Sequence, residues 1–223
     1  MMQRVLEPEI MDTQEDADEY AAIDNTDVNR EFVGSALELA PRSGVVLDVG
    51  TGPGDIAVLL AQRAPGLRVL AVDLGDRMLA MARRNVAAAG LDARVRVARA
   101  DAKQTGEPAG SFDMVLSNSL VHHIPEPDLF FAEMKRVARD GAALFVKDLH
   151  RPATEAEHAH LVATYAADCT PYQRRLFSDS LRAALTVDEV EAICERLELR
   201  DARVRRTSDR HWCLERRASA AGV

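Results

Sequence analysis

A glycine-rich turn flanked by two carboxylates is the stretch of this sequence whose chemistry can be inferred most directly. Gly50, Gly52 and Gly54 follow an apolar run, with Asp48 before them and Asp55 directly after them. Glycines permit positive φ angles and let a ligand approach the backbone closely. A dinucleotide would bring an anionic pyrophosphate to such a turn, and the two carboxylates would repel it. The turn therefore predicts a site for a ligand that carries positive charge.

The spacing of this turn departs from the G-x-G-x-x-G pattern of dinucleotide sites, because Asp55 follows Gly54 and the last glycine is missing. The turn resembles the first motif of the class I S-adenosylmethionine (SAM)-dependent methyltransferases, in which an acidic residue precedes three alternating glycines. The resemblance covers roughly residues 32–148, and the rest more loosely, and is to the small-molecule, type 11-like members. It implies a Rossmann-like fold, SAM as the methyl donor and S-adenosylhomocysteine as the product.

Further polar residues follow later strands at the intervals typical of that family. Asp73 ends a predicted strand about 20 residues after the glycines, where its carboxylate can accept both ribose hydroxyls. The resemblance assigns the adenine amine to Asp101 and the adenine ring to the backbone amide of Ala102. A helix cap at Asp73 and a plain turn residue at Asp101 are the structural alternatives. The resemblance implies this cofactor-binding set: Asp48, Gly50, Gly52, Gly54, Asp73, Leu74, Met78, Asp101, Ala102, Asn118 and Tyr20.

The candidate catalytic residues follow Asn118, at the end of the fourth predicted strand. His122 and His123 complete a pattern similar to the Asn-x-x-x-His-His of many small-molecule members. Methyl transfer from a sulfonium is an in-line displacement of an already activated donor, so deprotonation of the acceptor is the remaining task. Either histidine could serve as the base, or could only pack against or cap the next helix. Asp148, which ends the fifth strand, is an alternative base or substrate anchor.

The long segment Arg151–Leu185 reads as a helical insertion over the substrate side of the sheet. Its aromatic residues Tyr165, Tyr172 and Phe177 either line an acceptor pocket or pack the insertion internally. An insertion of this length at the ligand edge is better explained as a lid than as an inert loop. We therefore predict these three aromatics as substrate-binding residues.

No metal site is expected from the sequence. His158 and His160 flank one residue of a predicted helix and so point to different faces, without a carboxylate cluster nearby. Cys169, Cys194 and Cys213 are an odd number of widely spaced cysteines, which indicates reduced, structural thiols.

The elements that must position these residues alternate along the chain between short apolar runs and segments with helical periodicity, which predicts βαβ units and a parallel sheet. Gly66, Gly90 and Gly141 are expected to end the intervening helices. The expected core strands are Val45–Val49, Arg68–Val72, Val95–Ala98, Phe112–Ser117 and Ala143–Lys147. Arg200–Arg206 and His211–Glu215 are expected to complete a mostly parallel, seven-stranded sheet with helices on both faces and a helical lid.

The chain is expected to form one domain in four parts. Residues 1–40 are an acidic lid extension in which Tyr20, Asp24 and Asn29 would close over the methionine end of SAM, unless they form a simple tail. Residues 41–150 are the SAM-binding core, 151–187 the helical insertion, and 188–223 a last helix and two strands.

Composition limits the classes of partner that the chain is expected to bind. The 223 residues are 47% hydrophobic, enough for one core, and a net charge of −8 opposes binding to nucleic acid. We find no secretory signal and no run of about 18 apolar residues, so we expect no membrane contact and a cytoplasmic location. A small-molecule acceptor is expected as the partner, and the sequence permits a homodimer.

Three alternative functions stay open beside methylation of a small molecule: a nicotinamide-dependent oxidoreductase, a SAM-binding protein without catalysis, and a methyltransferase of protein or RNA. The first would need a Tyr-x-x-x-Lys or similar pair, which we do not find. The acceptor atom is not encoded in any motif. A thiol ionises near neutrality and needs the least help from a base, which favours sulfur over oxygen and nitrogen.

Overall fold

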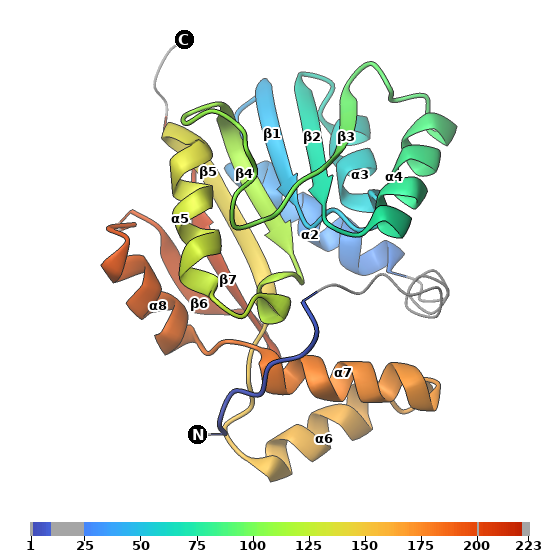
Figure 1. The fold of residues 1–223 in the computed structure, drawn as a ribbon, viewed down its shortest axis with the longest axis vertical. Helices are drawn as coiled ribbons and strands as arrows, with labels where there is room; N and C mark the ends of the chain where they lie inside the picture. Colours follow the sequence, from blue (N-terminus) through green and yellow to red (C-terminus); the bar gives the residue numbers. More distant parts are fainter. Residues whose placement is uncertain (1, 10–24, 200, 220–223) are drawn as a thin grey trace.

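A seven-stranded sheet forms the centre of the computed structural model, which describes residues 2–9, 25–199 and 201–219. The strand order is β3-β2-β1-β4-β5-β7-β6, and β7 runs antiparallel to both of its neighbours while the other pairs are parallel (Figure 1). This confirms the predicted α/β class and its mostly parallel sheet. The strands are β1 Gly44–Val49, β2 Leu67–Asp73, β3 Val95–Arg99, β4 Phe112–Asn118, β5 Ala138–Leu149, β6 Arg203–Arg206 and β7 His211–Arg216.

Helices cover both faces of the sheet because its central strands are apolar on both sides, as parallel strands usually are. Successive residues of a strand point to opposite faces, so Val46 joins the cluster beneath one helical layer and Leu47 the cluster beneath the other, both fully buried. The first layer holds α2 Thr26–Leu39, α3 Asp55–Arg63 and α4 Asp76–Ala88, and the second holds α5 Pro127–Val137 and α8 Val187–Arg196.

Helix α2 belongs to the core layer, although we expected residues 1–40 to form a lid extension. Phe32 is fully buried, and its ring centroid lies 4.8 Å from that of Phe145 on β5. The apolar residues of α2 recur at helical spacing and form a stripe along one face. Burying that stripe against the sheet stabilises α2 more than leaving it exposed above a cavity would. Asn29 is buried on this helix, whereas Tyr20 and Asp24 lie outside the described residues.

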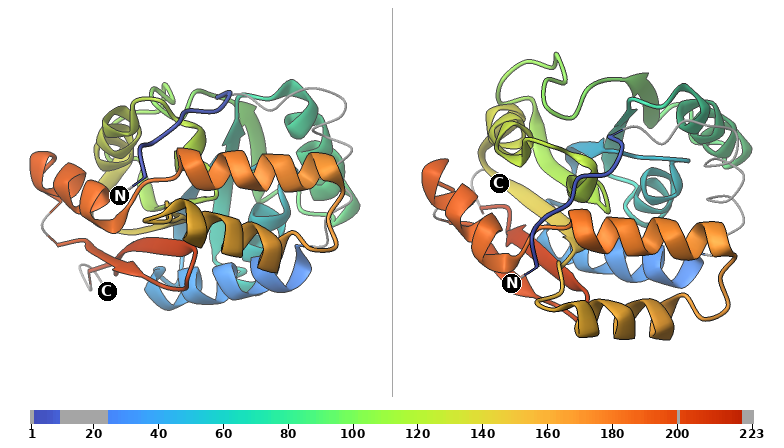
Figure 2. Two further views of the ribbon diagram at one scale, coloured as in Figure 1. Left: turned by 90° about the horizontal axis from the view of Figure 1, so that it is seen from below. Right: turned by 60° about the horizontal axis from the view of Figure 1, so that its bottom comes forward.

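Two antiparallel helices, α6 Glu155–Tyr165 and α7 Pro171–Ala183, lie across the carboxyl ends of the strands (Figure 2). Thr154 and Thr170 accept hydrogen bonds from backbone amides in the first turns, which fixes where the two helices begin. Residues 2–9 run beside α7 and past the short 3-10 helix η1 Val121–His123. The amide of Val5 donates to the carbonyl of Arg182, so this N-terminal segment is attached to α7.

Two of the three glycine-based predictions of helix ends were wrong. Gly90 does follow α4, with φ of 66°. Gly141 instead lies inside β5, because α5 ends at Val137 and the chain enters the strand directly, with a register shift opposite β4. Gly66 lies beyond the end of α3 at a close approach, where an added Cβ would come within 2.5 Å of the Arg42 carbonyl oxygen.

Candidate active site

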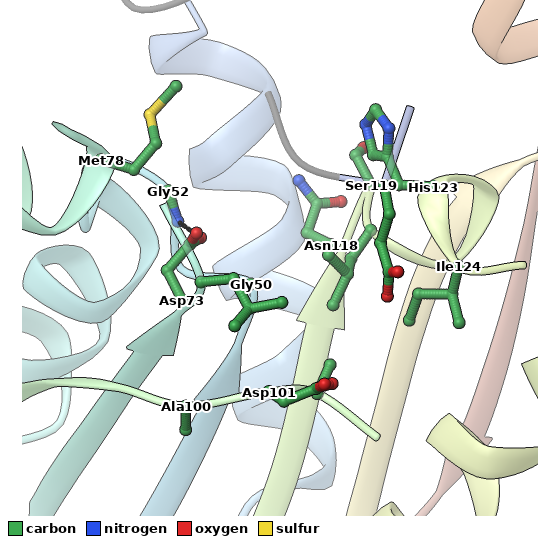
Figure 3. Close-up of a pocket in the computed structure, with 14 residues that line it drawn as sticks. Gly50, Gly52, Asp73, Met78, Ala100, Asp101, Asn118, Ser119, His123 and Ile124 are labelled. Atoms are coloured by element: carbon green, nitrogen blue, oxygen red, sulfur yellow. Dashed lines mark hydrogen bonds between the residues drawn. The ribbon is translucent and has the colours of Figure 1, made fainter. Parts of the chain in front are cut away.

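A cavity with an empty volume of about 930 Å³, partly continuous with solvent, opens at the carboxyl ends of β1, β2 and β4 (Figure 3). It brings together eight of the residues predicted to bind the cofactor, from four separate loops. They are Gly50, Gly52, Asp73, Leu74, Met78, Asp101, Ala102 and Asn118. The remaining lining residues are Glu9, Ala100, Ser119, Leu120, His123 and Ile124.

The glycine turn is shaped by three left-handed residues, with φ of 71° at Gly50, 54° at Gly52 and 83° at Gly54. A Cβ at Gly50 would clash with the Leu120 side chain at 2.7 Å, and one at Gly54 would press on Ala82 of α4. A Cβ at Gly52 would meet nothing within 4 Å, so this residue presents bare backbone to the cavity. The turn therefore leaves room for a ligand to contact the backbone at Gly52.

Asp73 holds two adjacent loops in place from the end of β2. Its Oδ2 accepts a hydrogen bond from the amide of Gly52 at 2.9 Å, and its Oδ1 accepts one from the amide of Gly75 at 2.8 Å. The carboxylate thus keeps a fixed orientation at the cavity wall. Holding the two loops and binding a ribose would use the same two oxygens of Asp73, so the structural role does not exclude the proposed ligand role.

Asp48 and Gly54, both predicted to bind the cofactor, do not line the cavity. Asp48 is 1% exposed beneath the turn, and Thr51 donates a hydrogen bond of 2.6 Å to its Oδ2. Burial raises the pKa of Asp48 to about 7, against the lowering effect of the Thr51 bond and with a further raising effect of Asp73. Asp48 therefore supports the turn from below, and Gly54 begins α3 beside it.

His122 and Asp148 form a buried pair beside the cavity. His122 Nδ1 lies 2.5 Å from Asp148 Oδ1, and the side chains are 5% and 1% exposed. Burial acts to lower the pKa of His122, but the charge and hydrogen bond of Asp148, with the charge of Glu7, outweigh it and raise the pKa. Burial acts to raise the pKa of Asp148, but His122 outweighs it and the pKa is lowered. Each group therefore favours the charged form of the other, and of the two histidines only the neighbouring His123 lines the cavity.

The comparison with known proteins agrees with this geometry. Residues 46–141 match the family model of a methyltransferase domain. Over 123 residues the chain is 38% identical to the demethylmenaquinone methyltransferase of Thermus thermophilus. This alignment covers 55% of this chain and 54% of that protein. Over these segments the chain is similar to methyltransferases.

Two further proteins extend the similarity. Over 157 residues the chain is 29% identical to the ubiquinone biosynthesis O-methyltransferase of Xanthomonas axonopodis pv. citri, covering 70% of this chain and 64% of that protein. A proposed SAM-dependent methyltransferase of Methanococcus maripaludis shares the fold with a TM-score of 0.70 at 16% identity, covering 98% and 100% of the two chains. The chain spans 54% and 64% of the lengths of the two curated relatives.

The N-terminal segment supplies two carboxylates to this site that sequence reasoning missed. Glu9 lines the cavity and forms an ion pair with Lys103, while Glu7 Oε1 lies 3.7 Å from His122 Nε2 and 3.2 Å from His123 Nδ1. Each contact joins residues about a hundred positions apart, so no local sequence spacing predicts that either glutamate belongs to the site. The acidic composition of the N-terminus was the only available signal.

The three lid aromatics lie away from the described cavity lining. The Tyr165 hydroxyl donates to Asp209 Oδ2 at 2.7 Å, and the Arg210 guanidinium covers its ring at 3.4 Å from the centroid. Tyr172 lies beneath Arg175, and Phe177 packs against the buried cluster between α6, α7 and the end of β5. Their predicted role in acceptor binding stays a prediction.

In the described part of the chain, no helix has the length and apolar character needed to cross a membrane.

Proposed function

We propose that this chain transfers a methyl group from SAM to a nucleophilic heteroatom of a small molecule. The observation that carries the proposal is the convergence of four loops on one cavity, with bare backbone at Gly52 beside the oriented carboxylate of Asp73. Asp73 would accept the ribose hydroxyls, and Asp101 and Ala102, which also line the cavity, would hold the adenine. When bound, SAM supplies an activated methyl group on a sulfonium.

The acceptor belongs in the part of the cavity lined by Ser119, Leu120, His123 and Ile124, beyond the glycine turn. The protein aligns the nucleophile and excludes water, so that the acceptor lone pair forms the new bond to the methyl carbon while the carbon–sulfur electrons return to sulfur. The acceptor proton must leave, and His123 is the titratable side chain of the predicted histidine pair that faces this space. His122 and Asp148 fix the short helix that carries His123.

The acceptor atom is proposed from chemistry alone. A thiol requires the least help from a base, so sulfur is the first acceptor to test. One relative is named as an O-methyltransferase and another as acting on demethylmenaquinone, so phenols and quinols are the second group. Amines form the third group.

The test has two stages. Calorimetry should show binding of SAM and S-adenosylhomocysteine, and no comparable binding of NAD. Incubation with methyl-labelled SAM and a panel of thiols, phenols and amines should then give a labelled product by mass spectrometry. Binding of NAD in place of SAM would overturn the proposal. Binding of SAM with label transferred only to protein or RNA would overturn the small-molecule acceptor.

A further inference from the structure

Three potential metal ligands from distant parts of the chain meet beside the cavity. Glu7 comes from the N-terminal segment, and His122 and His123 come from η1. One ligand atom of each lies within 4.8 Å of the other two, and the side chains are 6%, 5% and 14% exposed. The cluster is therefore largely buried, unlike the exposed groups of acidic residues that are common without a bound ion.

The distances in this cluster suit a transition-metal ion. Zinc bonds to imidazole nitrogen and carboxylate oxygen are about 2.0 to 2.2 Å long, so neighbouring ligand atoms around one ion lie about 3 to 3.5 Å apart. Glu7 Oε1 lies 3.2 Å from His123 Nδ1 and 3.7 Å from His122 Nε2. Two histidines and one glutamate are also a ligand set of catalytic zinc and of mononuclear iron sites.

The surroundings of His122 match those of a metal-binding histidine. Such a histidine usually donates its second ring N–H to a carboxylate, which fixes the tautomer and aims the other nitrogen at the ion. Asp148 occupies that place at Nδ1, and it is itself held by the amides of Val121 and Leu149 at 2.6 Å each. The other ring nitrogen, Nε2, lies 3.7 Å from Glu7 Oε1.

Glu7 provides an independent observation. Its Oε2 accepts a hydrogen bond from Ser180 on α7, but its buried Oε1 accepts no hydrogen bond from the described residues, although both imidazoles approach it. A buried carboxylate oxygen that faces two ring nitrogens at these distances is well placed for a shared cation.

We propose that Glu7, His122 and His123 bind one divalent transition-metal ion, with Zn²⁺ as the reference ion. This departs from our expectation that the site contains no metal. Because three protein ligands leave coordination positions open and His123 lines the cavity, the ion borders the acceptor region. Resting on the proposed function, its role is to lower the pKa of an acceptor thiol or hydroxyl, whose proton passes to water before the anion attacks the methyl carbon.

The test measures metal binding directly and needs no acceptor. The full chain is stripped with a chelator and titrated with Zn²⁺ and Co²⁺ by calorimetry, and the visible spectrum of the Co²⁺ form is recorded. We expect one saturable site, and at least a tenfold loss of affinity in Glu7→Gln. Glu38→Gln makes the same change at an exposed glutamate, and His160→Gln removes an exposed histidine, so both controls should retain the affinity of the original chain.

The outcomes separate this proposal from the proposed function. No saturable binding, equal affinity in Glu7→Gln, or a sulfur-to-cobalt charge-transfer band from cysteine ligation would each overturn the metal site. SAM affinity is measured on the same samples. If the chain binds SAM but no metal, the metal site is overturned and the methyltransferase proposal stands. If it binds metal but no SAM, the methyltransferase proposal is overturned and the metal site stands.

Discussion

Asp73 combines a structural and a ligand-binding task at one carboxylate. Both of its oxygens already accept backbone amides, so removing the side chain would disturb the glycine turn as well as the ribose contact. Asn keeps one carbonyl acceptor and loses the charge, which makes it the sharper substitution.

We predict that Asp73→Asn weakens SAM binding by about tenfold or more, because charge-assisted hydrogen bonds contribute about 1.5 to 3 kcal/mol. Calorimetry with SAM checks this. Asp76→Asn, the same change at an exposed position three residues later, should leave the affinity within about twofold, or on the order of 0.4 kcal/mol. Unchanged affinity in Asp73→Asn would remove this residue from the cofactor site.

Asp48 should make stability depend on pH in the ligand-free chain. Its pKa is about 7 in the folded state and 3.8 in the reference state, so folding retains a proton that the unfolded chain loses. This contribution is complete below pH 3.8 and is lost as the pH rises through about 7. The folded state therefore becomes less stable across that window because a carboxylate buried in the core must ionise there.

We predict that Asp48→Asn removes this loss, on the order of 2 kcal/mol between about pH 5 and about pH 7, or roughly 4 to 8 °C in Tm. Differential scanning calorimetry of both proteins at several pH values measures it. The Asn carbonyl can still accept the Thr51 hydroxyl, so the turn keeps its support. Parallel Tm curves for the two proteins would contradict a raised pKa at Asp48.

Much of the cavity lining could be predicted, because each of its loops directly follows a strand and parallel strands bring their carboxyl ends to one edge. Asp73, Asp101 and Asn118 were found in this way. Glu7 and Glu9 could not be found, because their positions depend on how the N-terminal segment docks against α7. The burial of Asp48 beneath the turn was also not encoded in spacing, since a motif gives the order of residues and not the direction of a side chain.

At the scale of elements, Arg151 joins three separate segments at the base of the lid. Its guanidinium donates to the carbonyls of Met2 at 3.0 Å and Ala184 at 2.7 Å and to Glu189 Oε1 at 2.6 Å. The side chain is 5% exposed, so these bonds replace the water that the charge gives up. The N-terminal segment, the end of α7 and α8 are thus tied to one residue.

We predict that Arg151→Met lowers the free energy of unfolding by about 3 kcal/mol, because it leaves buried carbonyls and Glu189 without their donor. Arg196→Met removes an arginine that pairs with Asp128 at a surface where both side chains are about half exposed, and should cost less than about 1 kcal/mol. Urea denaturation of both variants measures the difference. Equal losses would show that burial of the Arg151 cluster adds nothing to stability.

The helical lid shows where element-level prediction succeeded and where it stopped. A helical segment over 151–185 was predicted, and its two helices are present with Thr caps at both starts. The orientation of each helix about its axis could not be predicted, because α6 has no strong apolar stripe and Tyr165 is instead held by the turn between β6 and β7. Aromatic residues in a lid therefore did not by themselves indicate a cavity wall.

At the scale of the whole molecule, the N-terminal segment closes one side of the cavity without contributing to the sheet. Arg4 donates to the carbonyls of Ala183 and Ile124, which attaches the segment to both α7 and the loop after η1. The two core clusters contain no residue of this segment. Folding of the sheet and completion of the site therefore depend on different parts of the chain.

We predict that deletion of residues 2–9 preserves the circular dichroism spectrum but weakens SAM binding by about threefold or more, or roughly 0.7 kcal/mol, because the cavity loses the wall that contains Glu9. The double variant Glu7→Gln and Glu9→Gln tests whether the two carboxylates alone account for the effect. Loss of secondary structure on deletion, or unchanged affinity for SAM, would contradict this division of roles.

The antiparallel course of β7 decides how the protein can be tethered. Because β7 runs against its neighbours, residues 217–219 emerge at the edge where the parallel strands begin, and the amides of Ala218 and Ser219 donate to the carbonyls of Leu39 and Gly141 there. A fusion partner or surface linker attached behind residue 219 would start from the side of the molecule opposite the cavity (Figure 1). One attached ahead of Met2 would start beside the lid, so assays of ligand binding should use the C-terminal attachment.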